Sequence, residues 1–304
     1  MSSKTLIVLV GPTAIGKTEL AIKIAQYLNT EIISADSRQF YREMEIGTAK
    51  PSAEELSAAK HHLVNSHSVN DDFTVGDFET EALSILDTIF KENDVAVLAG
   101  GSGLFVKAIT EGFDELPKAD PAIRAGLNSL FERDGIIPLQ EKLKTADPDY
   151  YKEVDLDNPQ RIIRALEVSI SSGLPFSSFR KRKQQSRNFK IIKIGLNTSR
   201  EELYNRINTR VDKMVASGLI NEVRNLLPYR NLNALNTVGY SEIFSYLDGD
   251  ILLEQAIDSI KQNTRRFAKR QLTWFRKDED IEWFEPSQYA EILKYIEQQH
   301  PPEG

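Results

Sequence analysis

The sequence predicts an α/β protein in which helices flank a parallel sheet and a helical insertion interrupts the chain. Three observations support this prediction. Apolar, β-branched runs alternate with helical patterns over the first hundred residues, which is typical of a parallel sheet. A glycine-rich octet follows the first of these runs. From about residue 116 to residue 183 only helical patterns occur, and a strand pattern then returns.

The first hundred residues contain three predicted strands and three predicted helices. The strands are short apolar runs, as expected of strands that are buried on both faces. The helices place apolar residues three and four positions apart. The predicted strands are 6–10, 31–35 and 95–99, and the predicted helices are 17–28, 53–59 and 78–91.

The rest of the chain is predicted to be an insertion followed by a return to the core. Residues 116–185 form the predicted helical insertion domain. Residues 1–115 and 186–304 form the core. A strand at 191–196 rejoins the sheet, and helices are predicted at 200–214, 220–227, 252–277 and 288–298.

The octet at residues 11–18, GPTAIGKT, matches the phosphate-binding pattern G-x-x-x-x-G-K-[ST]. Its glycines let successive N–H groups point inward, and the start of the following helix adds partial positive charge. Lys17 supplies a mobile cation, and the Thr18 hydroxyl can ligate Mg²⁺. Because the octet joins a predicted strand to a predicted helix, a chance match is disfavoured and the core is predicted to be P-loop NTPase-like. Which phosphorylated compound binds stays open at this point.

Composition excludes several classes of protein. The 304 residues include no cysteine, which excludes disulfides, a cysteine nucleophile and a cysteine-based zinc site. The four histidines lack the spacing of metal ligands. No stretch approaches the ~20 apolar residues of a membrane span, and the N-terminus shows no cleavable signal pattern. We therefore expect a cytoplasmic protein with no membrane partner.

Two further polar turns follow predicted strands and should meet the octet at one edge of the sheet. Asp36 follows the second strand, where it could act as a general base or assist Mg²⁺, or could cap the turn; these roles are compatible. The glycine-rich stretch 100–103 follows the strand at 95–99 and includes Ser102. It allows close approach of a ligand, or it is a strand-to-helix turn without chemistry.

Basic residues form local clusters although the net charge is −7. Arg206 and Arg210 lie on one face of a predicted helix. They could stabilise a leaving group, or they could form a solvated face paired with Glu202 or Asp212. An unbroken basic run occupies residues 180–183.

The predicted helix at 252–277 carries a stripe of basic residues. Seven of them lie at 261–277, and no acidic residue stands between Asp258 and Asp278 to pair with them. Aromatic residues at 274–275 lie within the same stretch. Cationic side chains beside aromatic ones favour nucleic acid over a solvated face, although each aromatic residue taken alone is more often part of a core.

Taken together, these motifs resemble the tRNA dimethylallyltransferase family. The matching stretches run in order along nearly the whole chain, so the resemblance is more specific than the octet alone. They are Gly11–Thr18, Ile33–Gln39 with Tyr41, Ile46–Pro51, His61–Leu63, Gly100–Leu104, Asn158–Arg161, Arg164–Glu167, Val238–Tyr240 and Lys269–Trp274.

The resemblance implies transfer of a dimethylallyl group from dimethylallyl diphosphate to the exocyclic amine of the adenosine 3′ of certain tRNA anticodons. The products are isopentenyladenosine and diphosphate. It implies that the phosphate loop holds an isoprenoid diphosphate instead of a nucleotide, with Mg²⁺ as cofactor. The implied partners are the tRNA anticodon stem-loop and dimethylallyl diphosphate, and we expect a monomer.

The resemblance also implies roles for individual residues. The general base falls on Asp36, the hydroxyl partner of the target amine on Ser102, and the diphosphate-binding arginine on Arg210. Diphosphate binding falls on Gly11, Thr13, Ala14, Gly16, Lys17 and Thr18, with Thr18 as the metal ligand. tRNA binding falls on Ser37, Gln39, Lys50, Gln160, Arg161, Arg164, Arg180, Lys181, Arg182, Lys183, Arg265, Arg266, Lys269 and Arg270.

Several positions depart from the usual family pattern. Ser102 stands where the family has Thr, which keeps a hydroxyl. Phe105 replaces a common Tyr, and Asn65 stands where Asp is usual. The basic run at 180–183 occupies a region where the family often has a Gln contact. The lack of cysteine excludes the C-terminal zinc module of eukaryotic relatives and points to a bacterial-type enzyme.

Three alternatives stay open at this stage. Phosphate loops are commonest in ATP and GTP binders, so a small-molecule kinase is the first. A prenyltransferase that acts on free adenine nucleotides is the second, and a non-catalytic RNA-binding protein with a relic loop is the third. The basic helix and the insertion favour tRNA over the first two. The third is disfavoured because the chain retains Lys17, Thr18, Asp36 and Arg210 together.

Overall fold

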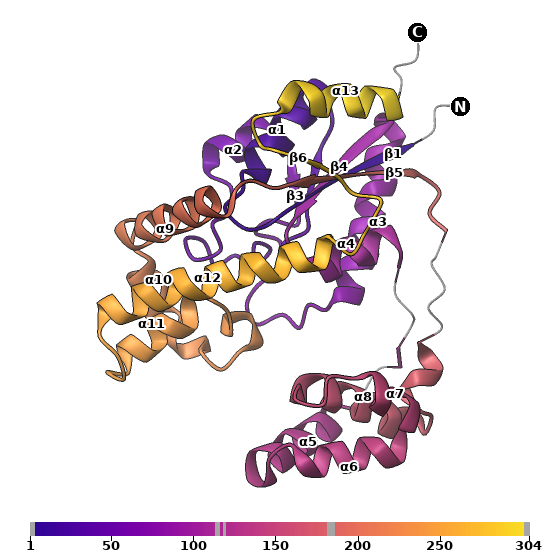
Figure 1. The fold of residues 1–304 in the computed structure, drawn as a ribbon, viewed down its shortest axis with the longest axis vertical. Coiled ribbons are helices and arrows are strands. Elements are labelled where there is room, and N and C mark those ends of the chain that lie inside the picture. The colour runs from indigo at the N-terminus through magenta and orange to yellow at the C-terminus, as the bar shows by residue number, and fades with distance from the viewer. Residues whose placement is uncertain (1–3, 113–115, 118–119, 181–185, 301–304) are drawn as a thin grey trace. The chain divides into compact units, whose positions relative to one another are not determined.

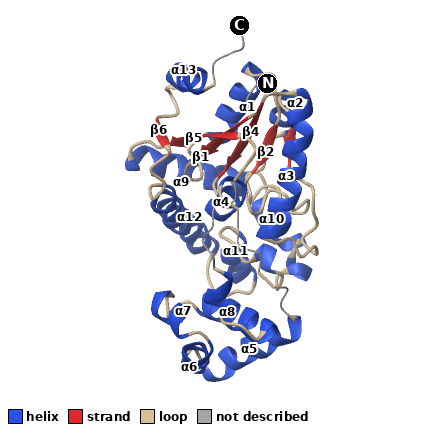
Figure 2. Ribbon diagram, turned by 90° about the vertical axis from the view of Figure 1, so that its right-hand side faces the viewer, coloured by secondary structure: helices blue, strands red, loops and turns tan. Residues whose placement is uncertain are grey.

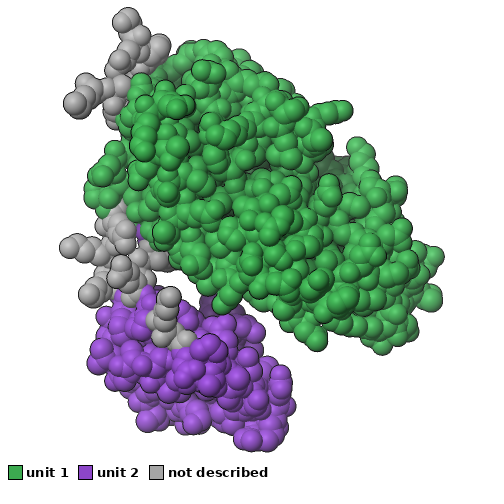
Figure 3. Space-filling model, turned by 180° about the vertical axis from the view of Figure 1, so that it is seen from behind, with its two compact units in different colours: residues 1–111, 186–304 green, residues 112–185 purple. Residues whose placement is uncertain are grey.

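The protein divides into two compact units, which are coloured separately in Figure 3. The computed structural model describes residues 4–112, 116–117, 120–180 and 186–300. Unit 1 comprises residues 1–111 and 186–304, and unit 2 comprises residues 112–185. The sequence-based boundary at 115 therefore lies four residues beyond the first boundary of the structure.

Unit 1 is built on a six-stranded parallel sheet in the order β3-β2-β4-β1-β5-β6. The central strand β1 pairs with β4 and β5, and its last residue, Val10, lies opposite Gly100 and Gly195. All six residues of β1 are buried, which explains its continuous apolar run. The strands are β1 (Thr5–Val10), β2 (Ile32–Ser34), β3 (His61–His62), β4 (Val95–Gly100), β5 (Lys190–Leu196) and β6 (Glu282–Phe284).

Helices cover both faces of this sheet (Figures 1 and 2). In Figure 2, α1 and α13 lie above the sheet and α4 lies below it. Ile24 of α1 and Ile296 of α13 share one buried cluster with Ile7 and Val97 of the sheet. The helices of unit 1 are α1 (Lys17–Tyr27), α2 (Ala53–Ala58), α3 (Val75–Glu92), α4 (Gly103–Thr110), α9 (Arg200–Ala216), α10 (Leu219–Asn225), α11 (Tyr240–Leu247), α12 (Leu253–Phe275) and α13 (Tyr289–Gln299).

Unit 2 is helical throughout its described residues and has its own core. Four of its helices begin with a proline at the first or second position, where the missing N–H costs nothing. Leu139, Leu143 and Ile162 are fully buried within this core. The elements of unit 2 are α5 (Pro121–Asp134), α6 (Ile137–Ala146), α7 (Pro148–Glu153), α8 (Pro159–Ser172) and the 3₁₀ turn Phe176–Phe179.

The sequence-based elements match the structure in type, and the omissions have simple causes. Strands β3 and β6 were not predicted because they contain only two and three residues, too few for a periodic pattern. Helices α4 and α11 have eight residues each, which is below the length at which periodicity is distinctive. None of the helices in the described part of the chain is long and apolar enough to cross a membrane.

Candidate functional site

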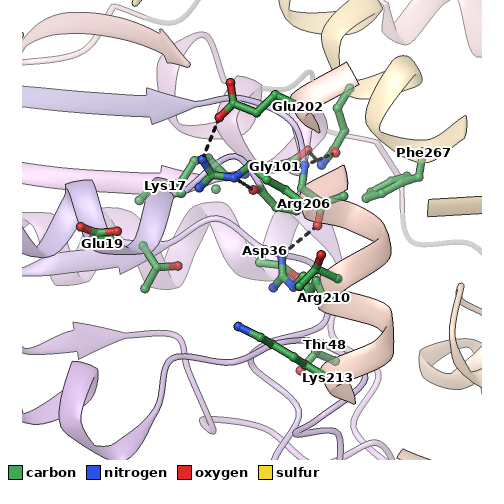
Figure 4. Close-up of a pocket in the computed structure, with 18 of the residues that line it drawn as sticks. Lys17, Glu19, Asp36, Thr48, Gly101, Glu202, Arg206, Arg210, Lys213 and Phe267 are labelled. Atoms are coloured by element: carbon green, nitrogen blue, oxygen red, sulfur yellow. Dashed lines mark hydrogen bonds and ion pairs between the residues drawn. The ribbon is translucent and has the colours of Figure 1, made fainter. Parts of the chain in front are cut away.

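A cavity of about 890 Å³ opens in unit 1 where the turns that follow β1, β2 and β4 meet. The phosphate loop contributes Thr13, Ala14 and residues 16–18, the turn after β2 contributes Asp36, and the turn after β4 contributes Gly100 and Gly101. Helix α9 supplies the facing wall (Figure 4). This is the carboxyl edge of a parallel sheet, where ligands bind in open α/β folds. The three polar turns singled out in the sequence therefore meet in one place.

Lys17, the first residue of α1, lies within this cavity. Its Nζ donates to the carbonyl oxygens of Gly11 and Pro12 at 3.0 and 2.7 Å. An ammonium group has three N–H donors, so one remains for a ligand. Burial, reinforced by the nearby Arg210 charge and opposed by Asp36, lowers the pKa of Lys17 to about 7. A bound anion would restore its charge, which makes Lys17 suited to a phosphate oxygen.

Arg206 and Arg210 hold the facing wall of the cavity to the phosphate loop. Arg206 Nε donates to Ala14 O at 3.0 Å, and the residue also pairs with Glu202 at 3.4 Å. Arg210 Nη1 donates to Thr13 Oγ1 at 3.2 Å. The sequence left two alternatives for this pair, a leaving-group site and a solvated face with acidic partners. Only the Arg206–Glu202 contact matches the solvated face. Burial lowers the pKa of Arg210, with Asp36 opposing the effect, and a guanidinium stays charged nonetheless.

Asp36 both caps its turn and lines the cavity. Its Oδ1 accepts the backbone N–H groups of Arg38 and Gln39 at 2.9 and 3.4 Å. The Ser102 hydroxyl accepts the backbone N–H of Ser37 at 3.0 Å, which joins the turn after β4 to the turn after β2. The carboxylate and the hydroxyl are therefore held at neighbouring points of the sheet edge. Both alternatives for Asp36, cap and reactive group, are compatible with this geometry.

Gln271 of α12 connects the two glycine-containing loops and was given no role by the sequence. Its Oε1 accepts the backbone N–H of Thr13 at 2.8 Å, and its Nε2 donates to Gly101 O at 2.8 Å. A Cβ on Gly101 would lie 2.3 Å from that Nε2, so only glycine allows this approach. The available signal was that Gln271 lies in the family-like stretch at 269–274.

The cavity offers a hydroxyl and a carboxylate to a metal ion, from Thr18 and Asp36. In the described part of the chain, no group of three or more His, Cys, Asp or Glu side chains is placed to hold a metal by itself. Mg²⁺ is usually held by one or two protein groups together with substrate phosphates and water. The residues present fit such a shared site and do not fit a cage built from protein ligands alone.

Ser37, Gln39 and Lys50, which were predicted to bind tRNA, lie between β2 and α2 and make hydrogen bonds within unit 1. Gln39 Nε2 donates to the carbonyl oxygens of Thr48 and Ala49 at 3.3 and 3.2 Å. Lys50 Nζ donates to Asn65 Oδ1 and to the carbonyl oxygen of Tyr41. Ser37 contributes its backbone N–H to the Ser102 contact already described. A tRNA contact by Gln39 or Lys50 would have to replace or share these bonds.

The predicted tRNA residues of unit 2 lie on or after α8. Gln160 and Arg161 are exposed. Arg164 pairs with the buried Glu167 at 3.2 Å. Arg180 pairs with Glu153 at 3.0 Å, and its guanidinium lies 5.0 Å from the ring centroid of Tyr150. Lys181, Arg182 and Lys183 lie outside the described residues.

The basic stripe of α12 is divided between an inner and an outer part. Lys261 pairs with Asp212 of α9 at 2.6 Å, so the expectation that the stripe lacks acidic partners is wrong there; the partner comes from another helix. Arg265 donates to Asn208 of α9 at 2.7 Å. The outer part comprises Arg266, Lys269 and Arg270, which are exposed and form no ion pair among the described residues.

The two aromatic residues of α12 differ in their surroundings. Trp274 is 42% exposed, whereas Phe275 is 3% exposed and belongs to the core. Phe267 is also exposed, and the guanidinium of Arg270 lies 5.8 Å from its ring centroid. Cationic and aromatic groups thus share the exposed face of α12, and Phe267 continues it to the cavity wall.

Comparison with known proteins gives a consistent family. The family model described as IPP transferase matches residues 39–278. A tRNA dimethylallyltransferase of Christiangramia forsetii is 58% identical over 97% of this chain and 98% of its own length. One of Flavobacterium johnsoniae is 53% identical over 96% of this chain and 97% of its own length.

A solved structure is similar over nearly the full length as well. The full-length tRNA isopentenylpyrophosphate transferase of Bacillus halodurans is 38% identical, with a TM-score of 0.72, and the match covers 97% of this chain and 96% of that one. The similarity therefore includes both the cavity of unit 1 and the helical unit 2.

Proposed function

The chain belongs to the IPP transferase family, and on this basis we propose that it transfers a dimethylallyl group from dimethylallyl diphosphate to an adenosine of tRNA. It is a transferase that modifies tRNA, as its relatives are. The observation that carries the proposal is that Asp36 lies in one cavity with Lys17 and Arg210. Such a cavity pairs a proton acceptor with cations for a leaving group. The target within tRNA is the exocyclic amine of the adenosine 3′ of the anticodon.

The phosphate loop and α9 are the proposed diphosphate site. Thr13, Ala14 and residues 16–18 of the phosphate loop face the cavity, and Arg210 of α9 lines it as well (Figure 4). When the donor's C1–O bond breaks, its electron pair leaves with the diphosphate, and the negative charge grows on oxygen. Preorganised cations at that oxygen stabilise the transition state more than the ground state.

Asp36 is the proposed general base. The adenine amine is almost non-basic, so its lone pair attacks C1 of the dimethylallyl group while both N–H bonds are still in place. Positive charge then grows on nitrogen, and the carboxylate of Asp36 accepts one proton. Ser102 is proposed to orient the amine, because its hydroxyl is fixed by the N–H of Ser37.

Mg²⁺ is the proposed cofactor, shared between Thr18 and the donor diphosphate. When bound there, it would neutralise charge on the diphosphate oxygens. Asp36 lies in the same cavity and could assist from a second layer through water. The protein's own groups, Lys17 and Arg210, supply the remaining positive charge.

The exposed face of α12 is the proposed tRNA surface of unit 1. Its cations would neutralise backbone phosphates, and Trp274 offers a ring for stacking. The target base must leave its stack to reach the cavity, as in other enzymes that act on a base. We further propose a monomeric, cytoplasmic enzyme.

An assay in which the donor and then the acceptor are replaced tests this proposal. The protein is incubated with tRNA, Mg²⁺ and dimethylallyl diphosphate, and the tRNA is digested to nucleosides for mass analysis. We expect isopentenyladenosine from the position 3′ of the anticodon. Replacing the donor with ATP, or the tRNA with AMP, should give no prenylated product. Phosphate transfer that requires ATP would support a kinase, and prenylated AMP would support a free-nucleotide prenyltransferase.

A further inference from the structure

The segment Glu45–Ala49 presents two carbonyl groups to residues of the cavity. Gln39 Nε2 donates to Thr48 O and Ala49 O at 3.3 and 3.2 Å, and Arg210 Nη2 donates to the same Ala49 carbonyl at 3.4 Å. Ala49 has φ +47°, a conformation that residues other than glycine adopt only when their surroundings hold it. The position of Arg210 is therefore coupled to the shape of this segment.

Glu222 of α10 fixes the same segment through its backbone N–H groups. Its Oε2 accepts the backbone N–H groups of Glu45 and Ile46 at 3.1 and 2.6 Å, and its Oε1 accepts the N–H of Gly47 at 3.0 Å. Three successive amides thus converge on one carboxylate. Hydrogen bonds to a charged acceptor are the stronger kind, and together they fix both the position and the orientation of the segment.

Tyr240, the first residue of α11, holds Glu222 in place. Its phenol donates to Glu222 Oε1 at 2.6 Å, and the side chain is fully buried. The ring also lies directly against the segment, because a Cβ on Gly47 would be 2.5 Å from Tyr240 Cε2. Burial and the Glu222 carboxylate raise the pKa of Tyr240, so the phenol stays protonated and remains a donor.

Neither Glu222 nor Tyr240 is among the described residues that line the cavity. We propose that Glu222 and Tyr240 are positioning residues that fix the segment 45–49 and, through the carbonyl of Ala49, set Arg210 for the leaving diphosphate. This inference rests on the proposed function, since it takes Arg210 as the arginine that binds the diphosphate.

The inference predicts that a substitution at Glu222 lowers kcat even at a temperature where the variant is fully folded. In Glu222→Gln, a carboxamide replaces one carboxylate oxygen with an NH₂ group, which cannot accept the backbone N–H that faces it. A catalytic group displaced by about 1 Å can lower a rate about 100-fold. We expect Glu222→Gln to lower kcat by about 10- to 100-fold. The Kd for tRNA should stay within about 2-fold of wild type, because the exposed cations of α12 are unchanged.

Tyr240→Phe is the gentler variant. It keeps the ring that packs on Gly47 and removes only the hydrogen bond to Glu222. We expect it to lower kcat in the same direction by about 5-fold, the factor that corresponds to one hydrogen bond. This variant carries the test if Glu222→Gln does not fold.

Glu43→Gln is the matched control. Glu43 also accepts a hydroxyl and a backbone N–H, from Ser68 and Val69 at 2.6 and 3.0 Å. No hydrogen bond among the described residues joins it to the carbonyls of the segment 45–49. The control should lower the melting temperature without lowering kcat at a temperature where the protein is folded.

A double variant checks the route through Arg210. In an Arg210→Lys background, Glu222→Gln should lower kcat by no more than about 3-fold further, because two changes on one path are not additive. The inference is overturned if Glu222→Gln and Glu43→Gln lower kcat equally, or if Glu222→Gln melts at a lower temperature with normal kcat. A wild-type protein that forms no prenylated tRNA would contradict the proposed function itself, which separates the two failures.

Discussion

The cations of the cavity and the cations of α12 carry the same charge in opposite surroundings. Lys17 and Arg210 are half-buried in the cavity and held by the phosphate loop itself, through the carbonyls of Gly11 and Pro12 and the hydroxyl of Thr13. Arg266, Lys269 and Arg270 project into solvent. Buried, fixed charges act strongly on one atom of a ligand, because the surrounding dielectric is low. Exposed charges act weakly and over a surface, and salt screens them.

This difference assigns the two groups to different steps. A fixed charge stabilises charge that develops during the reaction, so its loss should lower kcat. An exposed charge adds to a long-range attraction that is equal in the ground state and the transition state, so its loss should weaken binding. Substitutions in the cavity are therefore expected to lower kcat and leave the Kd for tRNA unchanged. Substitutions on α12 are expected to raise that Kd and leave kcat unchanged.

The largest effect is expected at Asp36, which lies among the cavity cations. Asp36→Ala removes the proton acceptor and should lower kcat by about 1,000-fold. The Kd for tRNA should change little, because the exposed face of α12 is intact. Asp36→Asn keeps the shape of the side chain and its cap to Arg38, and it should lose the same activity. Recovery of activity in the Asn variant would mean that the cap, and not the base, matters.

The next effect is expected on α12. Replacing Arg266, Lys269 and Arg270 with Gln should weaken tRNA binding by about 30-fold at low salt and flatten its salt dependence. The value of kcat at saturating tRNA should stay near that of wild type. The matched control removes three exposed cations on other elements, by replacing Lys91, Arg224 and Lys294 with Gln. An equal loss in both variants would show that only net charge matters.

Gln271 sharpens the comparison because it lies on α12 but is buried. Gln271→Leu keeps the volume and removes the bonds to Thr13 and Gly101. We expect it to behave as a cavity residue, with kcat lowered by about 10-fold and tRNA affinity unchanged. Thr273→Val is the control, since Thr273 is exposed on the same helix. A loss of tRNA affinity in Gln271→Leu would assign the effect to the helix as a whole.

An effect of a different kind, on stability, is expected at Lys17. Burial lowers its pKa from 10.5 to about 7, so the unfolded chain binds the proton more tightly than the folded protein does. The charged form therefore destabilises the folded state below pH 7, and this cost decreases as the pH rises from about 7 toward 10.5. Urea unfolding should show Lys17→Met to be more stable than wild type at low pH.

The pH dependence of that difference is the test. The gap between Lys17→Met and wild type should narrow as the pH rises above 7. Lys269→Met, which removes an exposed lysine, is the control for the loss of one charge. A gap for Lys17→Met that stays constant with pH would contradict the effect of burial.

The sequence predicted the parts of the site that lie on strand ends and not the contacts that join them. The octet, Asp36 and the stretch at 100–103 each follow a buried strand, so the rule for parallel sheets brought them together. Glu222 and Gln271 were not predicted as site residues because each forms hydrogen bonds to residues more than 150 positions away in the sequence. Such contacts are determined by packing, which leaves no local pattern.

The charge stripe of α12 also shows that contacts between distant segments cannot be predicted from a local pattern. Within the sequence it has no acidic neighbours, so its full length was expected to face nucleic acid. In the structure, Asp212 of α9 pairs with Lys261 and Asn208 holds Arg265. Only the outer cations are therefore left exposed on α12. Local charge patterns predict an exposed face well only where no other element packs against it.

One measurement tests the division between the two regions most directly. Single-turnover transfer of the dimethylallyl group to tRNA is measured for Asp36→Ala and for the variant of α12 that lacks Arg266, Lys269 and Arg270, with the tRNA concentration raised until the rate is constant. We expect the α12 variant to reach the wild-type rate at higher tRNA concentration, and Asp36→Ala to stay about 1,000-fold slower at every concentration. A normal saturating rate for Asp36→Ala, or a saturating rate for the α12 variant that stays low, would contradict this account.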